Sequence, residues 1–207
     1  MRILYIDTSS SYLYAAISEN DSKIVEIKKE FGRSLSEEAL PEIVELFQSI
    51  HINPADIDKI MVVSGPGSFT GIRIGMTIAK VCAWSMNIPI TTITSLEAMN
   101  ISSDSNTNRV PVINARRGNV FAAIYDSNNR QIMPSQLIKI VDLQQKLKSL
   151  EDYIFITNDD IEIIGNKESY SPKLQRIINY YKDKESINPH AVNPEYLKLT
   201  EAEENLI

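Results

Sequence analysis

The most distinctive pattern in the sequence is Ser64-Gly-Pro-Gly-Ser-Phe-Thr-Gly-Ile-Arg-Ile-Gly75. An apolar run, residues 60–63, comes before it, and a long helical pattern, residues 76–86, follows it. Because glycine adopts backbone angles that other residues resist, the stretch predicts a tight turn between a strand and a helix. A Gly-rich turn that opens a helix offers free N–H groups to an anion, so a phosphate site is one interpretation.

The spacing of this turn fits neither common phosphate motif. It contains no Gly-Lys-Ser or Gly-Lys-Thr ending, and Thr70 stands where a dinucleotide fingerprint needs its third glycine. The turn therefore needs another explanation, which the helix after it suggests.

A four-residue repeat of small residues marks that helix. Residues four apart are neighbours on a helix, so the repeat forms one small-residue ridge. Its members are Gly71, Gly75, Ala79 and Ala83. The helix is apolar nearly all round, and such a helix is buried on more than one face. Two interpretations stay open: the ridge packs inside its own domain, or it receives a helix from another chain. In the second case we expect four apolar residues of the preceding helix at the same interface: Leu40, Ile43, Val44 and Phe47.

Composition limits the possible functions. The chain has 207 residues, with Lys+Arg 21 and Asp+Glu 27, which gives a net charge of −6. This acidic balance argues against a protein that binds nucleic acid tightly by itself. We expect no leader and no membrane span, because no apolar run is long enough. The single cysteine, Cys82, fits a reducing cytoplasm, and His51 and His190 stand apart from any metal-ligand cluster, so we expect no metal site.

The first part of the chain predicts a mixed sheet. Residues 3–6, 12–17 and 23–29 are strand patterns joined by short turns. Asp7 ends the first of these strands. Actin-like ATP-binding folds begin in the same way, and there the carboxylate faces metal-bound phosphates. Alternatively, the Asp7 carboxylate only forms hydrogen bonds within its own turn. Ser34-Leu-Ser-Glu37 fits a capping box that opens a helix. Residues 1–102 thus form a first lobe of order β-β-β-α-β-α-β-α, an α/β fold of actin-like or RNase H-like type.

The pattern then starts again. Residues 102–108 are small and polar, and we place the boundary between two lobes there. Residues 109–207 form a smaller second lobe of order β-β-β-α-β, followed by a helix from Ser171-Pro172 and a polar tail. No second Gly-Pro-Gly turn or small-residue helix follows, so the second lobe is a truncated copy of the first.

Several stretches resemble the TsaB family, also called YeaZ, whose members take part in threonylcarbamoyladenosine synthesis on tRNA in bacteria. The stretches are Ile3-Leu-Tyr-Ile-Asp-Thr-Ser-Ser10, residues 65–75, Ala115-Arg116 with Gly118, and Pro194-Glu-Tyr-Leu-Lys198 with Glu201-Ala-Glu203. The run of residues 65–75 is the most specific of them. The sequence departs from the family at Asn114, where an Asp is usual, and in its short second half.

The resemblance implies duplicated actin-like (ASKHA) lobes and no enzyme activity of the chain's own. It implies a TsaD-type catalytic partner, which carries the metal motif, a TsaE-type ATPase that joins them, and a homodimer when the chain is alone. The partner is expected on the first two helices, and tRNA contact only through the complex. No cofactor is expected beyond ATP or ADP at the interface with the catalytic partner. The expected contacts of such a nucleotide are Asp7, Thr8, Gly65 and Gly67.

Two other functions remain as alternatives. The first is an actin-like ATPase or small-molecule kinase that uses Asp7 and residues 65–71; a working cleft would need a phosphate loop from each lobe, and the second lobe lacks its Gly-rich turn. The second is a metalloprotease of the glycoprotease type, which the lack of metal-ligand spacing disfavours.

Overall fold

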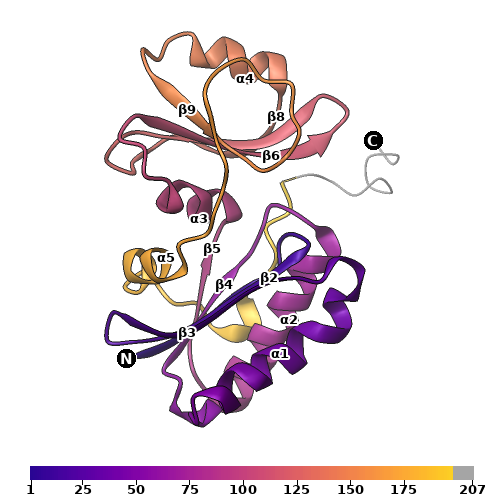
Figure 1. The fold of residues 1–207 in the computed structure, drawn as a ribbon, viewed down its shortest axis with the longest axis vertical. Helices are drawn as coiled ribbons and strands as arrows, with labels where there is room; N and C mark the ends of the chain where they lie inside the picture. The colour runs from indigo at the N-terminus through magenta and orange to yellow at the C-terminus, as the bar shows by residue number, and fades with distance from the viewer. Residues whose placement is uncertain (198–207) are drawn as a thin grey trace. The chain divides into compact units, whose positions relative to one another are not determined.

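The first sheet of the computed structural model has five strands in the order β3-β2-β1-β4-β5 (Figure 1). The structure describes residues 1–197. The strands are β1 (Arg2–Asp7), β2 (Tyr12–Glu19), β3 (Ser22–Glu30), β4 (Lys59–Val63) and β5 (Ile90–Ile93). β1, β2 and β3 pair antiparallel, whereas β4 pairs parallel with both β1 and β5. The predicted meander and mixed sheet are confirmed.

Two long helices cover one face of this sheet. They are α1 (Leu35–Ser49) and α2 (Phe69–Met86), and the short 3-10 turns η1 (Gly32–Ser34) and η2 (Pro54–Asp56) flank α1. Alternate residues of a strand point to the same face, so Leu4 and Ile6 of β1 join the core beneath the helices. The α1 residues Ala39, Ile43 and Leu46 complete that core.

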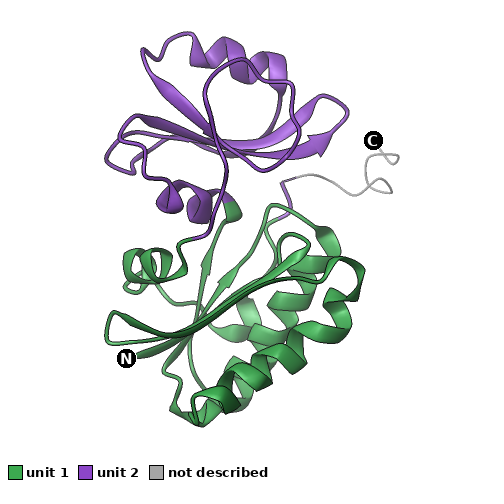
Figure 2. Ribbon diagram, viewed as in Figure 1, with its two compact units in different colours: residues 1–95, 173–195 green, residues 96–172, 196–207 purple. Residues whose placement is uncertain are grey.

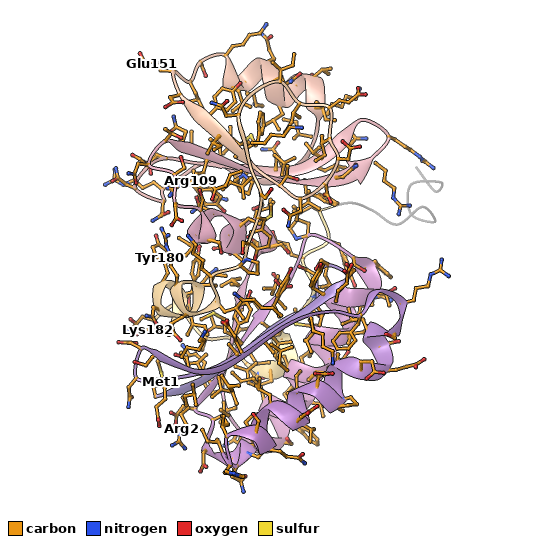
Figure 3. All side chains as sticks on the ribbon, viewed as in Figure 1. Met1, Arg2, Arg109, Glu151, Tyr180 and Lys182 are labelled. Carbon is orange, nitrogen blue, oxygen red and sulfur yellow. The ribbon has the colours of Figure 1, made fainter. Side chains whose placement is uncertain are left out.

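The other face of the sheet is covered by a helix from late in the chain. α5 (Leu174–Tyr181) contacts β1, β2 and β3, and its Ile178 lies near Ile3. Lys182, labelled in Figure 3, follows this helix, and its ammonium lies 2.7 Å from the Asp21 carboxylate. The chain then returns along the open edge of β5 by a bridge between Ile90 and Ile187, and passes through η3 (Pro189–Ala191). We call residues 182–195 the strap.

The second sheet repeats the topology of the first. Its order is β10-β9-β6-β7-β8, and its strands have the same relative directions. The strands are β6 (Asn108–Arg116), β7 (Asn119–Tyr125), β8 (Gln131–Lys139), β9 (Tyr153–Ile156) and β10 (Lys167–Glu168). α4 (Ile140–Leu147) corresponds to α1. No helix joins β9 to β10, where the first sheet has α2, so the predicted truncated copy is confirmed.

The two compact units differ from the predicted lobes (Figure 2). Among the described residues, unit 1 comprises residues 1–95 and 173–195, and unit 2 comprises residues 96–172 with residues 196 and 197. α3 (Ser95–Ser102) belongs with unit 2 from Leu96 onward, because Leu96 and Met99 pack with Ala123 and Tyr125. The polar linker at residues 102–108 therefore lies inside unit 2, and α5 lies in unit 1 rather than in the second lobe.

Two local expectations need correction. The Ser34 side chain makes no capping hydrogen bond to α1, because Ser34 is the last residue of η1 and its backbone (φ −85°, ψ 1°) lacks the extended conformation of a capping residue. Its hydroxyl donates to the Phe31 carbonyl. The sequence predicts either residues 131–134 or residues 137–141 as the third strand of the second lobe, whereas β8 is continuous over Gln131–Lys139. The matching residues at 198 and 201–203 of the tail lie outside the described residues.

Candidate functional site

The Gly-rich turn packs directly against the turn that joins β1 to β2. The Ser68 N–H donates to the Ser9 carbonyl at 2.7 Å. A Cβ atom at Gly67 would lie 2.2 Å from that same carbonyl oxygen, so no larger residue fits. The Gly67 position is therefore explained by the close approach of two backbones.

Thr8 connects the end of β1 to the first turns of α2. Its hydroxyl donates to the Gly71 carbonyl at 2.7 Å and accepts from the Gly75 N–H at 3.0 Å. These two backbone groups are four residues apart and so form one rung of the helix. We call this arrangement the Thr8 bridge. A Cβ atom at Gly71 would lie 2.1 Å from the Thr8 carbonyl oxygen, and one at Gly75 would lie 2.2 Å from the Thr8 hydroxyl oxygen.

The small-residue ridge therefore faces the interior of unit 1. Gly71 and Gly75 are buried against Thr8, and Ala79 and Ala83 are 0% exposed within the core. The interpretation that this ridge receives a helix from another chain is wrong, because its own sheet already fills that space. Ile43 and Phe47 of α1 are likewise core residues, at 2% and 7% exposure. Of the predicted interface residues, Leu40 and Val44 are exposed.

Asp7 and its neighbours have internal partners. The Asp7 carboxylate is buried and accepts the Ser9 N–H at 2.8 Å. Burial raises its pKa, against the opposing effect of the hydrogen bonds from Ser9. Burial and the nearby Asp7 charge raise the pKa of Tyr14 to about 12. Burial thus works against the charged form of the Asp7 carboxyl group, in contrast to a carboxylate that faces solvent.

Two of the residues expected to contact a phosphate, Thr8 and Gly65, are engaged in contacts within unit 1. A hydroxyl has one donor, and the Thr8 hydroxyl gives it to Gly71, so Thr8 has no hydrogen to offer a phosphate. A Cβ atom at Gly65 would lie 2.8 Å from the Ile72 side chain and 3.2 Å from the Glu195 carbonyl, which belongs to the end of the strap. Packing within unit 1 thus accounts for both residues.

The outer faces of α1 and α2 carry exposed apolar side chains. Leu40 and Val44 on α1 are 50% and 46% exposed, and Val81 and Trp84 on α2 are 57% and 65% exposed. Between the helices lies an apolar groove of about 750 Å³, which includes Leu40, Val44, Phe47, Cys82 and Met86 in its walls. We call these four exposed side chains and the groove the α1–α2 surface. Leu40 and Val44 line this groove, while Val81 and Trp84 lie exposed elsewhere on the outer face of α2. Isolated exposed apolar residues are ordinary, but exposed apolar residues that line a groove are typical of an interaction site.

The sequence of α2 contains a signal for its exposed face. Arg73, Thr77, Val81 and Trp84 recur at spacings of four and three, so they share one helix face. The sequence pattern predicts a bulky apolar face of Ile74, Ile78 and Val81, with Trp84 on the remaining arc. The placement of Val81 on that face is wrong, because Val81 is 57% exposed. Because Arg73 and Thr77 are polar, the helix face that they share with Val81 is expected to face solvent.

The described residues show neither a metal centre nor a membrane span. In residues 1–197, no group of three or more His, Cys, Asp or Glu side chains is placed to hold a metal ion. No helix in that range is long and apolar enough to cross a membrane. Burial raises the pKa of the half-buried Cys82 thiol, which favours its protonated, unreactive form.

The class of protein follows from the fold together with a match to a protein family. Two sheets of the same strand order, each with helices, define an α/β protein with duplicated actin-like lobes. A family model described as "TsaD: tRNA N6-adenosine threonylcarbamoyltransferase" matches residues 17–205.

Individual relatives narrow the class. The chain is 32% identical to "tRNA threonylcarbamoyladenosine biosynthesis protein TsaB" of Bacillus subtilis, over 98% of this chain and 96% of that protein. It is 30% identical to the Escherichia coli protein of the same name, over 64% of this chain and 58% of that protein. A structure described as "YeaZ from Pseudomonas aeruginosa" has the same fold, with a TM-score of 0.77 and 15% identity over 95% of this chain and 99% of that chain. The chain belongs to the TsaB (YeaZ) family.

Proposed function

We propose that this protein is a non-catalytic partner subunit in the synthesis of threonylcarbamoyladenosine next to the anticodon of tRNAs that read codons beginning with A. The observation that carries the proposal is the α1–α2 surface, where the exposed side chains of Leu40 and Val44 line an apolar groove and those of Val81 and Trp84 lie exposed on the outer face of α2. The names of its relatives and of the matching family support the pathway.

The partner at this surface is a TsaD-type catalytic subunit. Two helices with an apolar outer face can bury on the order of 1,600 Å² in total with a partner, which suffices for a specific complex. Aromatic side chains contribute most to such interfaces, and Trp84 stands on the exposed face of α2. When the chain is alone, a second copy covers the same face, so homodimer and complex exclude each other.

The remaining components join through this complex. A TsaE-type ATPase binds the assembled pair, and tRNA is held by the complex, because a chain of net charge −6 attracts phosphates poorly by itself. An ATP or ADP shared with the catalytic subunit stays a prediction, with Asp7, Thr8, Gly65 and Gly67 as the expected contacts. An ATPase or kinase of this chain alone has less support, since Asp7 is buried and the Thr8 hydroxyl donates internally.

Replacement of Val44 by a charged residue tests the proposal. In Val44→Asp, assembly would take a carboxylate out of water without a partner, so we expect affinity for the catalytic subunit to fall by about 100-fold or more. Thermal unfolding should be nearly unchanged, because Val44 is 46% exposed. Ile132→Asp, at a site 50% exposed on unit 2, is the matched control and should bind normally.

The cellular measurement uses the same pair of variants. Cells depleted of the wild-type protein should lose threonylcarbamoyladenosine, measured by mass spectrometry of digested tRNA. Ile132→Asp should restore the modification and Val44→Asp should not. Unchanged modification after depletion, or equal rescue by both variants, would contradict the proposal.

A further inference from the structure

The Thr8 bridge and the α1–α2 surface lie on opposite sides of one helix. Gly71 and Gly75 face inward to Thr8, while Val81 and Trp84 face outward. α2 spans Phe69–Met86, and a helix of this length turns as one body when its inner face shifts. A residue that fixes the inner face therefore also fixes where the outer side chains stand.

The contacts along the inner face differ in what they can fix. Ala79 and Ala83 meet the sheet through apolar packing, which is not directional and tolerates a small slide or rotation. The Thr8 bridge consists of two hydrogen bonds, at 2.7 Å and 3.0 Å, which need a defined geometry. Thr8 is 1% exposed, so water does not readily replace it.

We propose that Thr8 is a positioning residue for partner binding: its hydroxyl holds α2 in the rotation and axial position that place Val81 and Trp84 for the catalytic subunit. The part that concerns the partner rests on the proposed function above. The hydroxyl touches no partner itself, since it is buried beneath the helix. It acts through α2, and the ridge of glycines allows β1 to come close enough for the bridge to form.

Trp84 gives a readout that requires no partner. It is the single tryptophan of the chain, and its ring centroid lies 6.5 Å from that of His190 in an edge-to-face arrangement. Tryptophan emission therefore reports the position of α2 against the strap. In Thr8→Ala we expect a shift of the emission maximum and altered quenching by acrylamide. Thr8→Ser keeps the hydroxyl and should restore the wild-type signal.

A matched control separates positioning from a general loss of stability. Ile6 is also fully buried near the end of β1, and its Cγ2 would lie 3.5 Å from a Cβ atom at Gly75. Ile6→Val removes the Cδ1 methyl group from the core of unit 1, keeps the Cγ2 atom that faces Gly75, and removes no hydrogen bond. We expect it to lower the unfolding temperature while leaving Trp84 emission unchanged. Should Thr8→Ala not fold, Thr8→Cys takes its place, because a thiol is only a weak donor.

Affinity for the catalytic subunit is the second readout. We expect Thr8→Ala to weaken binding by about 2- to 30-fold, the range found for residues that act through a shared element. Thr8→Ser and Ile6→Val should bind within about twofold of the wild type. This pattern, together with the Trp84 shift, would support the proposal.

The outcomes distinguish the proposal from the function on which it rests. Unchanged Trp84 emission in folded Thr8→Ala overturns the positioning role, and so does an equal change in Ile6→Val. If the wild-type chain does not bind the catalytic subunit, the proposed function fails, while the emission of the isolated variants still decides whether Thr8 positions α2.

Discussion

Among single residues, Gly71 and Gly75 both lie against Thr8, but they contact different parts of it. In each case an atom of Thr8 occupies the space that the Cβ atom of a larger residue would need. At Gly71 the obstacle is the Thr8 backbone carbonyl, and at Gly75 it is the Thr8 side-chain oxygen. A side-chain obstacle can be removed by mutation, whereas a backbone obstacle cannot. The two glycines are thus a natural pair for testing the contact.

We predict that Gly75→Ala destabilises the protein by about 1–3 kcal/mol through overpacking, and that Thr8→Ala offsets part of this loss. The free energy of unfolding of the double variant, from urea titration, should exceed the additive value by about 1 kcal/mol or more. The control is Gly71→Ala with Thr8→Ala, whose effects should add within about 0.5 kcal/mol because the backbone carbonyl stays in place. Additive behaviour in both pairs would mean that the hydroxyl is not the obstacle.

At the scale of elements, the order of strands and helices could be predicted from sequence, but the side on which α2 packs could not. Strand alternation and helical spacing are local, so β1 to β5 and α1 to α3 follow from the pattern. A ridge of glycine and alanine, in contrast, suits close packing against either a sheet or a second helix. The deciding contact comes from Thr8, which lies 63 residues before Gly71.

Because Ala79 faces the core and Val81 faces solvent, we expect substitutions at these two positions of α2 to have opposite effects on stability and on binding. Ala79→Leu overfills the core and should lower the free energy of unfolding by about 1–3 kcal/mol, while the folded fraction still binds the catalytic subunit. Val81→Asp, on the exposed face, should change stability by less than about 0.5 kcal/mol. It should nevertheless weaken binding strongly.

Chemical denaturation and a binding titration of both variants check this pair. Loss of binding by folded Ala79→Leu together with normal binding by Val81→Asp would restore the ridge as the interface. The pair also shows why the candidate site was only partly predictable: both residues are apolar and lie on one helix, where the spacing of the polar residues indicates the exposed face and the burial of Ala79 in the fold decides between them.

At the scale of the whole molecule, each unit is completed by a helix that follows the last strand of the other sheet. α3 follows β5 yet packs in unit 2, and α5 follows β10 yet packs in unit 1. The sequence could not indicate this exchange, because a polar linker such as residues 102–108 looks like a boundary wherever it falls. Residues that complete unit 1 are therefore far from the rest of it in the chain.

The exchange predicts how fragments of the chain behave. Residues 1–95 alone lack α5 and the strap, so the buried side chains of Leu174, Ile177, Ile178 and Val192 have no counterpart. Each such side chain contributes about 1.5–3 kcal/mol when buried, so the loss is comparable to the roughly 5–15 kcal/mol stability of a domain. We expect this fragment to be unfolded or aggregated by circular dichroism and size-exclusion chromatography.

Addition of residues 173–195 as a separate peptide should restore a folded unit 1, because the peptide supplies both the helix and the edge pairing at Ile187. The matched control is the same peptide with Ile177→Asp and Ile178→Asp, which keeps its length but places charges where α5 meets the sheet. It should not rescue the fragment. A fragment of residues 1–95 that folds without any peptide would show that α5 and the strap are dispensable, and that unit 1 is complete within the first part of the chain.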